Sequence, residues 1–190
     1  MDILIYTSLA GIIIILIYGI MLYNSLVDLK HTVSQAWSNI DILLKQRHDE
    51  LPKLVETCKQ YMGFEQETLK QVIAARLQVA TAREAGNIGA LGPAENMLRV
   101  GLGNLFAVAE DYPELKASEQ FQHLQARISG LENSIADRRE YYNEAVKINN
   151  VRIEQFPEVI IASWFKFKAR DLLEFSDAEK QDVNIGKLFG

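Results

Sequence analysis

Apolar residues recur every three or four positions through most of the chain beyond residue 25, and this spacing constrains the fold more than any other feature. The first row comprises Leu26, Leu29, Val33, Ala36, Ile40 and Leu43. A neighbouring row comprises Trp37, Ile40, Leu44, Arg47, Leu51, Leu54, Cys58 and Tyr61, and it continues at Leu69, Val72, Ile73, Leu77 and Ala80. Such spacing places side chains on one helical face, and its average of about 3.5 residues is the repeat of left-handed bundles. Because the alternation typical of strands is absent, the sequence predicts an all-α fold.

Pro52 tests whether these rows lie on one helix. A proline inside a helix removes a hydrogen bond and costs about 3 kcal/mol. The helix could therefore break at Glu50–Leu51, with Pro52 in the first position of a new helix. An inserted loop would usually reset the apolar phase, yet Leu44 and Leu54 stay in phase across the proline. We therefore favour a kink within one helix from Tyr23 to Glu84, with the break as the alternative.

A second helix is predicted after a loop rich in glycine. The loop is residues 85–93, AGNIGALGP, with Pro93 in the first turn of the helix. The apolar face of this helix comprises Met97, Leu98, Leu102, Leu105, Phe106 and Ala109. The helix ends at Asp111–Pro113. Gly101 and Gly103 lie inside the pattern, where small residues permit a close approach of another helix.

A third long helix and a short fourth helix complete the predicted bundle. The third helix starts near Ser118, a residue suited to an N-cap, and reaches Glu154. Its face comprises Phe121, Leu124, Ile128, Leu131, Ile135, Arg138, Tyr142 and Ala145. The fourth helix spans Glu158 to Phe175, and residues 176–190 form a loose tail. Residues 23–175 therefore predict an elongated antiparallel bundle of three long helices and one short helix.

Residues 1–22 are predicted to be a transmembrane anchor. The run Ile3 to Leu22 reads ILIYTSLAGIIIILIYGIML and contains no charged residue. About 20 apolar residues in a helix cover the ~30 Å hydrocarbon core of a bilayer. A cleaved signal peptide is the alternative, but the run lacks a basic segment before it and an A-x-A site after it. Gly11 and Gly19 lie near one face of this helix, where small residues allow transmembrane packing.

The charge distribution bears on orientation and on partners. Lys30 is the only Lys or Arg within about fifteen residues after the anchor. The positive-inside rule therefore favours a cytoplasmic soluble domain, on the basis of this one charge. All 25 acidic residues except Asp2 follow the anchor, where they outnumber the 20 Lys and Arg residues. We therefore expect no nucleic-acid partner.

The candidates for chemistry are few. The three histidines, His31, His48 and His123, lack the Glu-x-x-His spacing of bundle metal sites, and we interpret them as solvated. Cys58, the single cysteine, lies on an apolar row and is interpreted as a buried, inert thiol. No phosphate-binding loop of the G-x-x-x-x-G-K type occurs. We expect no catalytic residues, no metal and no cofactor.

Polar residues on or beside the face of the third helix are more informative. The candidates for a buried polar network that sets the register of the bundle are Arg47, Glu132, Asn133, Arg138, Tyr142 and Asn143. Buried charges need partners, and a satisfied network can fix helix register. A solvated stripe with weak surface ion pairs is an equally good interpretation.

The segment SWFKFKAR, residues 163–170, mixes aromatic and basic side chains. Its candidates for contact with a membrane surface or a partner are Trp164, Phe165, Lys166, Phe167 and Lys168. Such mixtures can lie on a bilayer surface. The interpretation that we favour places the aromatic residues in the core and the basic residues outside.

Two blocks of the chain resemble the LemA family. Residues 23–76 contain the AWSNID–RH–P–LV block, and residues 112–162 contain the LEN–R–YYN–FP block. The matching motif residues are Trp37, Asn39, Arg47, Pro52, Glu132, Asn133, Arg138, Tyr142, Asn143 and Pro157. The resemblance implies a long-helix bundle in the bacterial cytoplasmic membrane, with no catalytic residue to carry over. It also implies a role in membrane organisation, as in magnetosome relatives.

These observations lead to two functional expectations. The first is a non-enzymatic, membrane-anchored scaffold that assembles as a homo-oligomer. The alternative is an adaptor that presents a partner, such as a membrane protease or sensor, at the bilayer.

Overall fold

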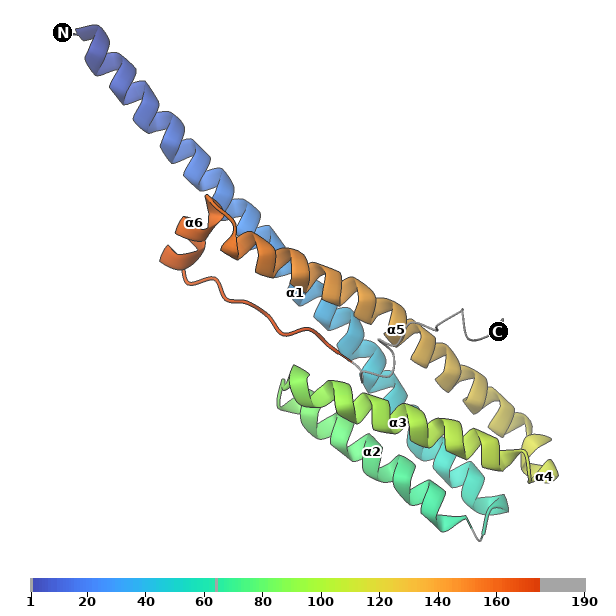
Figure 1. Ribbon diagram of the computed structural model, residues 1–190. Coiled ribbons are helices and arrows are strands. Elements are labelled where there is room, and N and C mark those ends of the chain that lie inside the picture. The colour runs from blue at the N-terminus through green and yellow to red at the C-terminus, as the bar shows by residue number, and fades with distance from the viewer. Residues whose placement is uncertain (1, 64, 175–190) are drawn as a thin grey trace, which may run out of the picture. The chain divides into compact units, whose positions relative to one another are not determined.

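The computed structural model of the chain describes residues 2–63 and 65–174. In these ranges all regular structure is α-helical, and no strand occurs. The helices are α1 (Asp2–Tyr61), α2 (Gln66–Glu84), α3 (Ile88–Ala109), α4 (Pro113–Lys116), α5 (Glu119–Glu154) and α6 (Glu158–Trp164), as labelled in Figure 1. The predicted all-α helical bundle is confirmed. The predicted tail, residues 176–190, lies outside the described residues.

The chain divides into two compact units. The first contains the residues up to Ser38 together with Glu140–Asp171. Of the described residues, the second contains those of the range Asn39–Arg139 together with residues 172–174. Helices α1 and α5 therefore each contribute residues to both units.

The first unit has a small core where α6 meets α1 and α5. Its buried apolar residues are Leu26, Ile153 and Ala162, with Ile161 and Phe167 packed against them. Arg152 of α5 reaches both neighbours, because its Nη2 donates to Ser25 Oγ (3.2 Å) and pairs with Glu158 Oε1 (2.9 Å). This arrangement fixes α6 beside the part of α1 that directly follows the apolar run.

The second unit buries many members of the predicted apolar rows. The buried residues include Leu44, Leu51 and Leu54 of α1, Val72 and Val79 of α2, Leu98, Leu102 and Leu105 of α3, and Phe121, Leu124 and Ile128 of α5. Helices α2 and α3 lie side by side (Figure 1). A Cβ at Gly101 would lie 3.5 Å from Val72 Cγ2, an ordinary van der Waals contact, and a Cβ at Gly103 would meet nothing within 4 Å. The packing of α2 on α3 therefore does not require a glycine at either position.

The predicted single helix from Tyr23 to Glu84 is wrong at residues 62–65. Helix α1 ends at Tyr61 and α2 begins at Gln66. Gly63, in the sequence YMGF, is a poor helix former by about 1 kcal/mol relative to alanine. Leu69 and Val72 of the predicted row are buried, but the buried face of α2 continues at Ala75 and Val79, and the predicted row member Leu77 is 54% exposed.

Pro52 lies inside α1 and does not break it. A residue with an N–H at this position would donate to the carbonyl of His48, four residues earlier. Arg76 of α2 replaces this missing donor, because its Nε donates to His48 O at 3.1 Å. The same guanidinium contacts His48 Nε2 at 2.7 Å. A neighbouring helix thus satisfies the backbone group that the proline leaves without its helical partner.

This substitution of one donor for another predicts an energetic coupling between Pro52 and Arg76. We expect Arg76→Ala to lower the free energy of unfolding by about 1–3 kcal/mol, because it leaves a carbonyl unsatisfied. In a Pro52→Ala background the new N–H can reach His48 O, so the cost of Arg76→Ala should be smaller by about 1 kcal/mol. Chemical denaturation of the four proteins in this cycle measures the coupling. Equal costs in both backgrounds would contradict the replacement of the donor.

Two further boundaries differ from the prediction. The loop predicted at 85–93 is shorter, because Asn87 caps α3 by accepting a hydrogen bond from Ala90 N at 3.0 Å. Pro93 therefore lies within α3. The fourth helix ends at Trp164 and does not continue towards Phe175. The third helix is confirmed, and Ser118 Oγ accepts from Phe121 N (3.4 Å) at its start.

Candidate functional site

A buried cluster of charged side chains joins α1, α3 and α5 in the second unit. Arg47 is 1% exposed, and its Nη2 donates to Glu95 Oε1 and Oε2 at 2.5 and 2.7 Å. Its Nη1 donates to Glu132 Oε1. Hydrogen bonds between a guanidinium and a carboxylate are among the strongest in proteins. The cluster therefore fixes three helices at one level of the core.

Burial and pairing oppose each other in this cluster. Burial lowers the pKa of Arg47, but Glu95 and Glu132 outweigh that effect and hold its pKa above the ordinary value. Burial raises the pKa of Glu95, and the positive charge of Arg47 limits the rise. Arg47 therefore lies in a buried polar cluster and not on a solvated stripe. The role of the cluster in setting the register of the helices stays a prediction.

The other members of the predicted network are scattered. Asn133 and Arg138 are exposed on α5. Tyr142 is buried in the first unit, where its hydroxyl donates to Asp171 O at 2.9 Å and its ring centroid lies 5.7 Å from that of Trp37. Asn143 is half-buried in the same unit. Of the six predicted residues, the structure thus brings together Arg47 and Glu132.

Glu95 belongs to the buried cluster but is not among the residues predicted for it. A signal for it exists, because it falls on a row of buried residues at three- and four-residue spacing. The row comprises Leu91, Glu95, Leu98, Leu102 and Leu105. An acidic residue inside an apolar row needs a buried partner, and Arg47 occupies the corresponding place on its own row.

A small polar cavity adjoins the cluster. It has a volume of about 110 Å³, and α3 and α5 line it with Glu95, Asn96, Arg99, Glu132, Asn133 and Arg139. Ligand pockets usually measure about 300–1,000 Å³, whereas one water occupies about 30 Å³. The cavity is therefore the size of a few water molecules.

The candidate nucleophile and the candidate metal ligands do not converge. Cys58 is fully buried, and burial raises its pKa to about 12, so the thiol is inert. His31 and His123 are exposed, and His48 is half-buried beside Arg76. Within residues 2–63 and 65–174, no three His, Cys, Asp or Glu side chains form a group that could hold a metal ion.

His48 predicts a dependence of stability on pH. Burial and the charge of Arg76 lower the pKa of His48. The unfolded chain therefore binds more protons than the folded chain between the lowered pKa and the ordinary value of about 6.5. We expect the free energy of unfolding contributed by this group to be complete above that value and to fall as the pH drops below it. Denaturation of the wild type and of His48→Gln between pH 5 and pH 8 measures this, with His123→Gln as the control.

The segment after α6 places aromatic side chains partly in the core and partly outside it. Phe167 packs against the core of the first unit. Trp164 is 79% exposed and Phe165 is 57% exposed, so the predicted burial of the aromatic residues is wrong for these two. Lys166 and Lys168 are exposed, as that interpretation expected.

Among the described residues, one stretch is long and apolar enough to cross a membrane, and it lies at the start of α1. The residues from Ile3 to Met21 are exposed, apart from Gly11 and Gly19, which are partly buried. An added Cβ at Gly11 or Gly19 would meet nothing within 4 Å. No contact with another described residue accounts for these glycines, and their transmembrane packing stays a prediction.

Comparisons with known proteins identify relatives of this chain. Two proteins of Paramagnetospirillum magneticum, Magnetosome protein MamQ 1 and Magnetosome protein MamQ 2, are each 23% identical over 193 residues, covering 90% of this chain and 71% of each relative. Protein LemA of Metamycoplasma hominis is 25% identical over 167 residues, covering 87% of this chain and 74% of that protein. The profile of the LemA family matches residues 36–186. The chain belongs to the LemA family.

Proposed function

We propose that this protein is a non-enzymatic scaffold, anchored in the membrane by the apolar start of α1, and that it self-associates to organise the membrane around it. The proposal rests on the way in which the buried charged side chains pair with one another. Arg47, Glu95 and Glu132 bond to one another across three helices. Such a cluster positions helices, and the adjoining cavity of about 110 Å³ is too small for most substrates.

The relatives support a membrane role. Two of them are named magnetosome proteins. In this chain the exposed apolar stretch from Ile3 to Met21 costs free energy in water, at about 25 cal/mol for each Å² of apolar surface. A bilayer removes that cost, so the stretch is best explained as a retained anchor.

Self-association is tested by counting subunits of the full chain in lipid nanodiscs over a range of protein-to-lipid ratios. We expect dimers or larger assemblies, and Gly11→Leu with Gly19→Leu should shift them towards monomers because bulky side chains prevent close packing in lipid. Ile12→Leu with Ile20→Leu is the matched control. A chain that stays monomeric at every ratio would refute self-association and leave only the anchor.

Orientation is tested with a thiol reagent that does not cross membranes. The native Cys58 is buried and does not react, so it supplies a silent background. Asp49→Cys places a thiol at an exposed position of α1. For a cytoplasmic folded domain we expect labelling after lysis and none in intact cells. Labelling in intact cells would place the domain on the other side.

A groove between α2 and α3 favours the adaptor as the second candidate. It has a volume of about 570 Å³ and mostly apolar walls, which include Leu77, Pro93 and Met97. Both Leu77 and Met97 are more than half exposed. Crosslinking in membranes from Leu77→Cys separates the candidates, because a scaffold yields mainly the chain itself and an adaptor yields mainly a different protein.

A further inference from the structure

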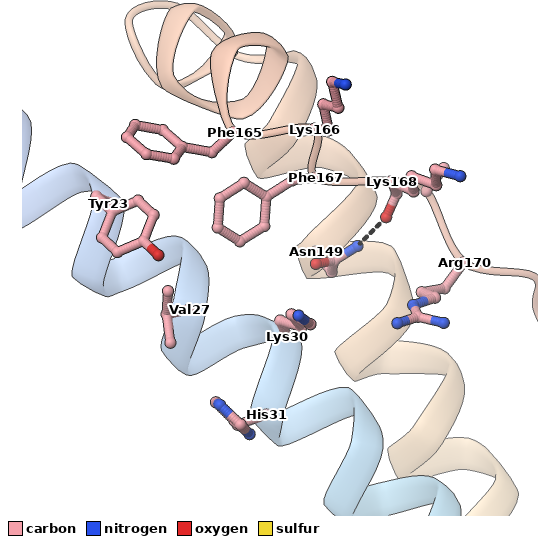
Figure 2. Close-up of a pocket in the computed structure, with 11 residues that line it drawn as sticks. Tyr23, Val27, Lys30, His31, Asn149, Phe165, Lys166, Phe167, Lys168 and Arg170 are labelled. Carbon is pink, nitrogen blue, oxygen red and sulfur yellow. Dashed lines mark hydrogen bonds between the residues drawn. The ribbon is translucent and has the colours of Figure 1, made fainter.

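A cavity in the first unit opens beside the proposed membrane anchor. Its volume is about 560 Å³, within the range of about 300–1,000 Å³ that is usual for ligand sites. Helix α1 contributes Tyr23, Val27, Lys30 and His31 to its wall, and residues 165–170 form the opposite wall. Figure 2 shows three rings, those of Tyr23, Phe165 and Phe167, gathered on one side and Lys30, Asn149 and Arg170 on the other.

The wall formed by residues 165–170 is held through its backbone. Asn150 makes two bonds to Arg170, because its Nδ2 donates to Arg170 O at 2.8 Å and its Oδ1 accepts from Arg170 N at 2.9 Å. Asn149 Nδ2 donates to Lys168 O at 3.4 Å. The ring centroid of Phe165 lies 4.6 Å from that of Tyr23. The basic side chains of this wall are therefore not needed to hold it in place.

These basic side chains remain available to a ligand. Within the described residues, no ion pair involves Lys30, Lys166, Lys168 or Arg170. No acidic residue is among those that line the cavity. Four basic side chains that make no ion pair with any described residue favour the binding of an anion near the cavity.

The position along α1 places this cavity at the depth of lipid headgroups. Val27 lies five residues beyond Leu22, the last residue of the apolar run, which corresponds to about 7.5 Å of helix. Lys30 lies about 12 Å beyond it. The headgroup layer of each leaflet is about 5–8 Å thick, and long basic side chains reach towards it from outside. The ring of Tyr23, with Phe165 against it, thus lies nearer the hydrocarbon and Lys30 lies farther from it, which matches the polarity of a phospholipid.

An exposed apolar stripe on α6 supports the same orientation independently. Ile160 and Trp164 lie four residues apart on α6 and are 54% and 79% exposed, and Phe156, two residues before the helix, is 80% exposed. Residues four apart lie on one helical face. Aromatic and aliphatic side chains on one face, beside basic residues, are typical of helices that lie in a membrane interface.

We propose that the cavity between Tyr23, Lys30 and residues 165–170 binds the phosphate-bearing headgroup of an anionic phospholipid, while the stripe on α6 lies in the interface of the same leaflet. This inference rests on the proposed membrane anchor. The lipid phosphate contacts Lys30 and Arg170, which flank the cavity in Figure 2, and the glycerol and upper acyl carbons contact the rings of Phe165 and Phe167.

Native mass spectrometry of the full chain in neutral detergent tests the headgroup site. The added probes are phosphatidylglycerol, phosphatidylcholine and inorganic phosphate. We expect preferential binding of phosphatidylglycerol, reduced about tenfold or more by the triple variant K166Q/K168Q/R170Q, since each basic residue near an anionic surface contributes about fivefold. K45Q/K59Q/K70Q, which removes the same charge from exposed positions elsewhere, should keep the preference. Equal losses in both triple variants, or displacement of the lipid by an equal concentration of phosphate, would overturn the site.

Fluorescence of Trp164 tests the interface. In a Trp37→Phe background and in vesicles containing phosphatidylglycerol, we expect lipids brominated on their acyl chains to quench Trp164 and aqueous iodide to quench it little. The reverse pattern would overturn the interfacial position of α6. Extraction with alkaline carbonate identifies a failure of the anchor separately, because a chain without a membrane span is released while its binding of lipid in detergent is unaffected.

Discussion

Replacing Arg47 with alanine is expected to lower the free energy of unfolding by about 3–5 kcal/mol, the usual cost of removing one partner of a buried ion pair. The side chains of Arg47 and Glu95 are 1% and 2% exposed, so the variant leaves a carboxylate in the core without its bidentate partner. Chemical denaturation of the full chain in detergent, followed by circular dichroism, measures the effect. The slope of the transition should not change, because the folded state keeps its overall burial.

An exposed ion pair provides the matched control. Arg127 is half exposed, and its Nε lies 2.9 Å from Glu50 Oε1. Such pairs contribute about 0–1 kcal/mol, so Arg127→Ala should change stability by no more than that. Equal effects at Arg47 and Arg127 would show that the buried cluster contributes nothing beyond a surface pair.

The role of the cluster in register needs a different variant. Replacing Arg47, Glu95 and Glu132 together with Met, Leu and Leu removes every charge of the cluster and leaves no unpaired group. Stability should then return to about the wild-type value or exceed it. If the cluster sets register, this triple variant should show faster hydrogen exchange along α5 despite its stability. Unchanged exchange would limit the cluster to packing.

Replacing Gly92 with valine is expected to lower the free energy of unfolding by about 2–3 kcal/mol. The valine should displace Leu173 from the core, and burial of a leucine side chain stabilises a fold by about that amount. A Cβ at Gly92 would lie 1.9 Å from the carbonyl oxygen of Glu174. The atom in the way belongs to the backbone, so rotation of a side chain cannot relieve the clash. The chain around Glu174 must move away from α3.

Gly103→Val on the same helix is the control for this substitution. Gly103 is exposed, and a Cβ there would meet nothing within 4 Å. Valine is a slightly better helix former than glycine, so this variant should be as stable as the wild type or more stable by a few tenths of a kcal/mol. Denaturation midpoints of the two variants give the comparison. A neutral Gly92→Val would show that the contact between Glu174 and α3 contributes little.

The fold could be predicted from the sequence because apolar spacing is a direct consequence of helix geometry. The buried positions from Leu26 to Leu54 and from Phe121 to Ile135 follow that spacing. The break at residues 62–65 was missed because the apolar phase shifts by only a small amount there, and Gly63 is a weak signal alone. The end of α6 was missed because bonds from Asn150 and Tyr142, distant in the sequence, hold the following segment out of a helix.

The candidate site could be predicted only in part, for a physical reason. Arg47 stands out as a charge inside an apolar row, but periodicity does not identify the partner of a buried charge. That partner lies on another helix and depends on how the helices align. Glu132 and Glu95 both fit the requirement, whereas Arg138 satisfies the same spacing and is exposed. Periodicity on a single helix also could not reveal the cavity between α1 and residues 165–170, whose walls come from opposite ends of the chain.

The backbone-held wall of that cavity has a consequence for how this protein can diversify. The carbonyl groups of Lys168, Arg170 and Asp171 accept the bonds that hold the segment, and every amino acid supplies a carbonyl. Side chains at these positions can therefore be exchanged while the wall keeps its course. A descendant of this chain can alter the charge and shape that it presents without building a new framework.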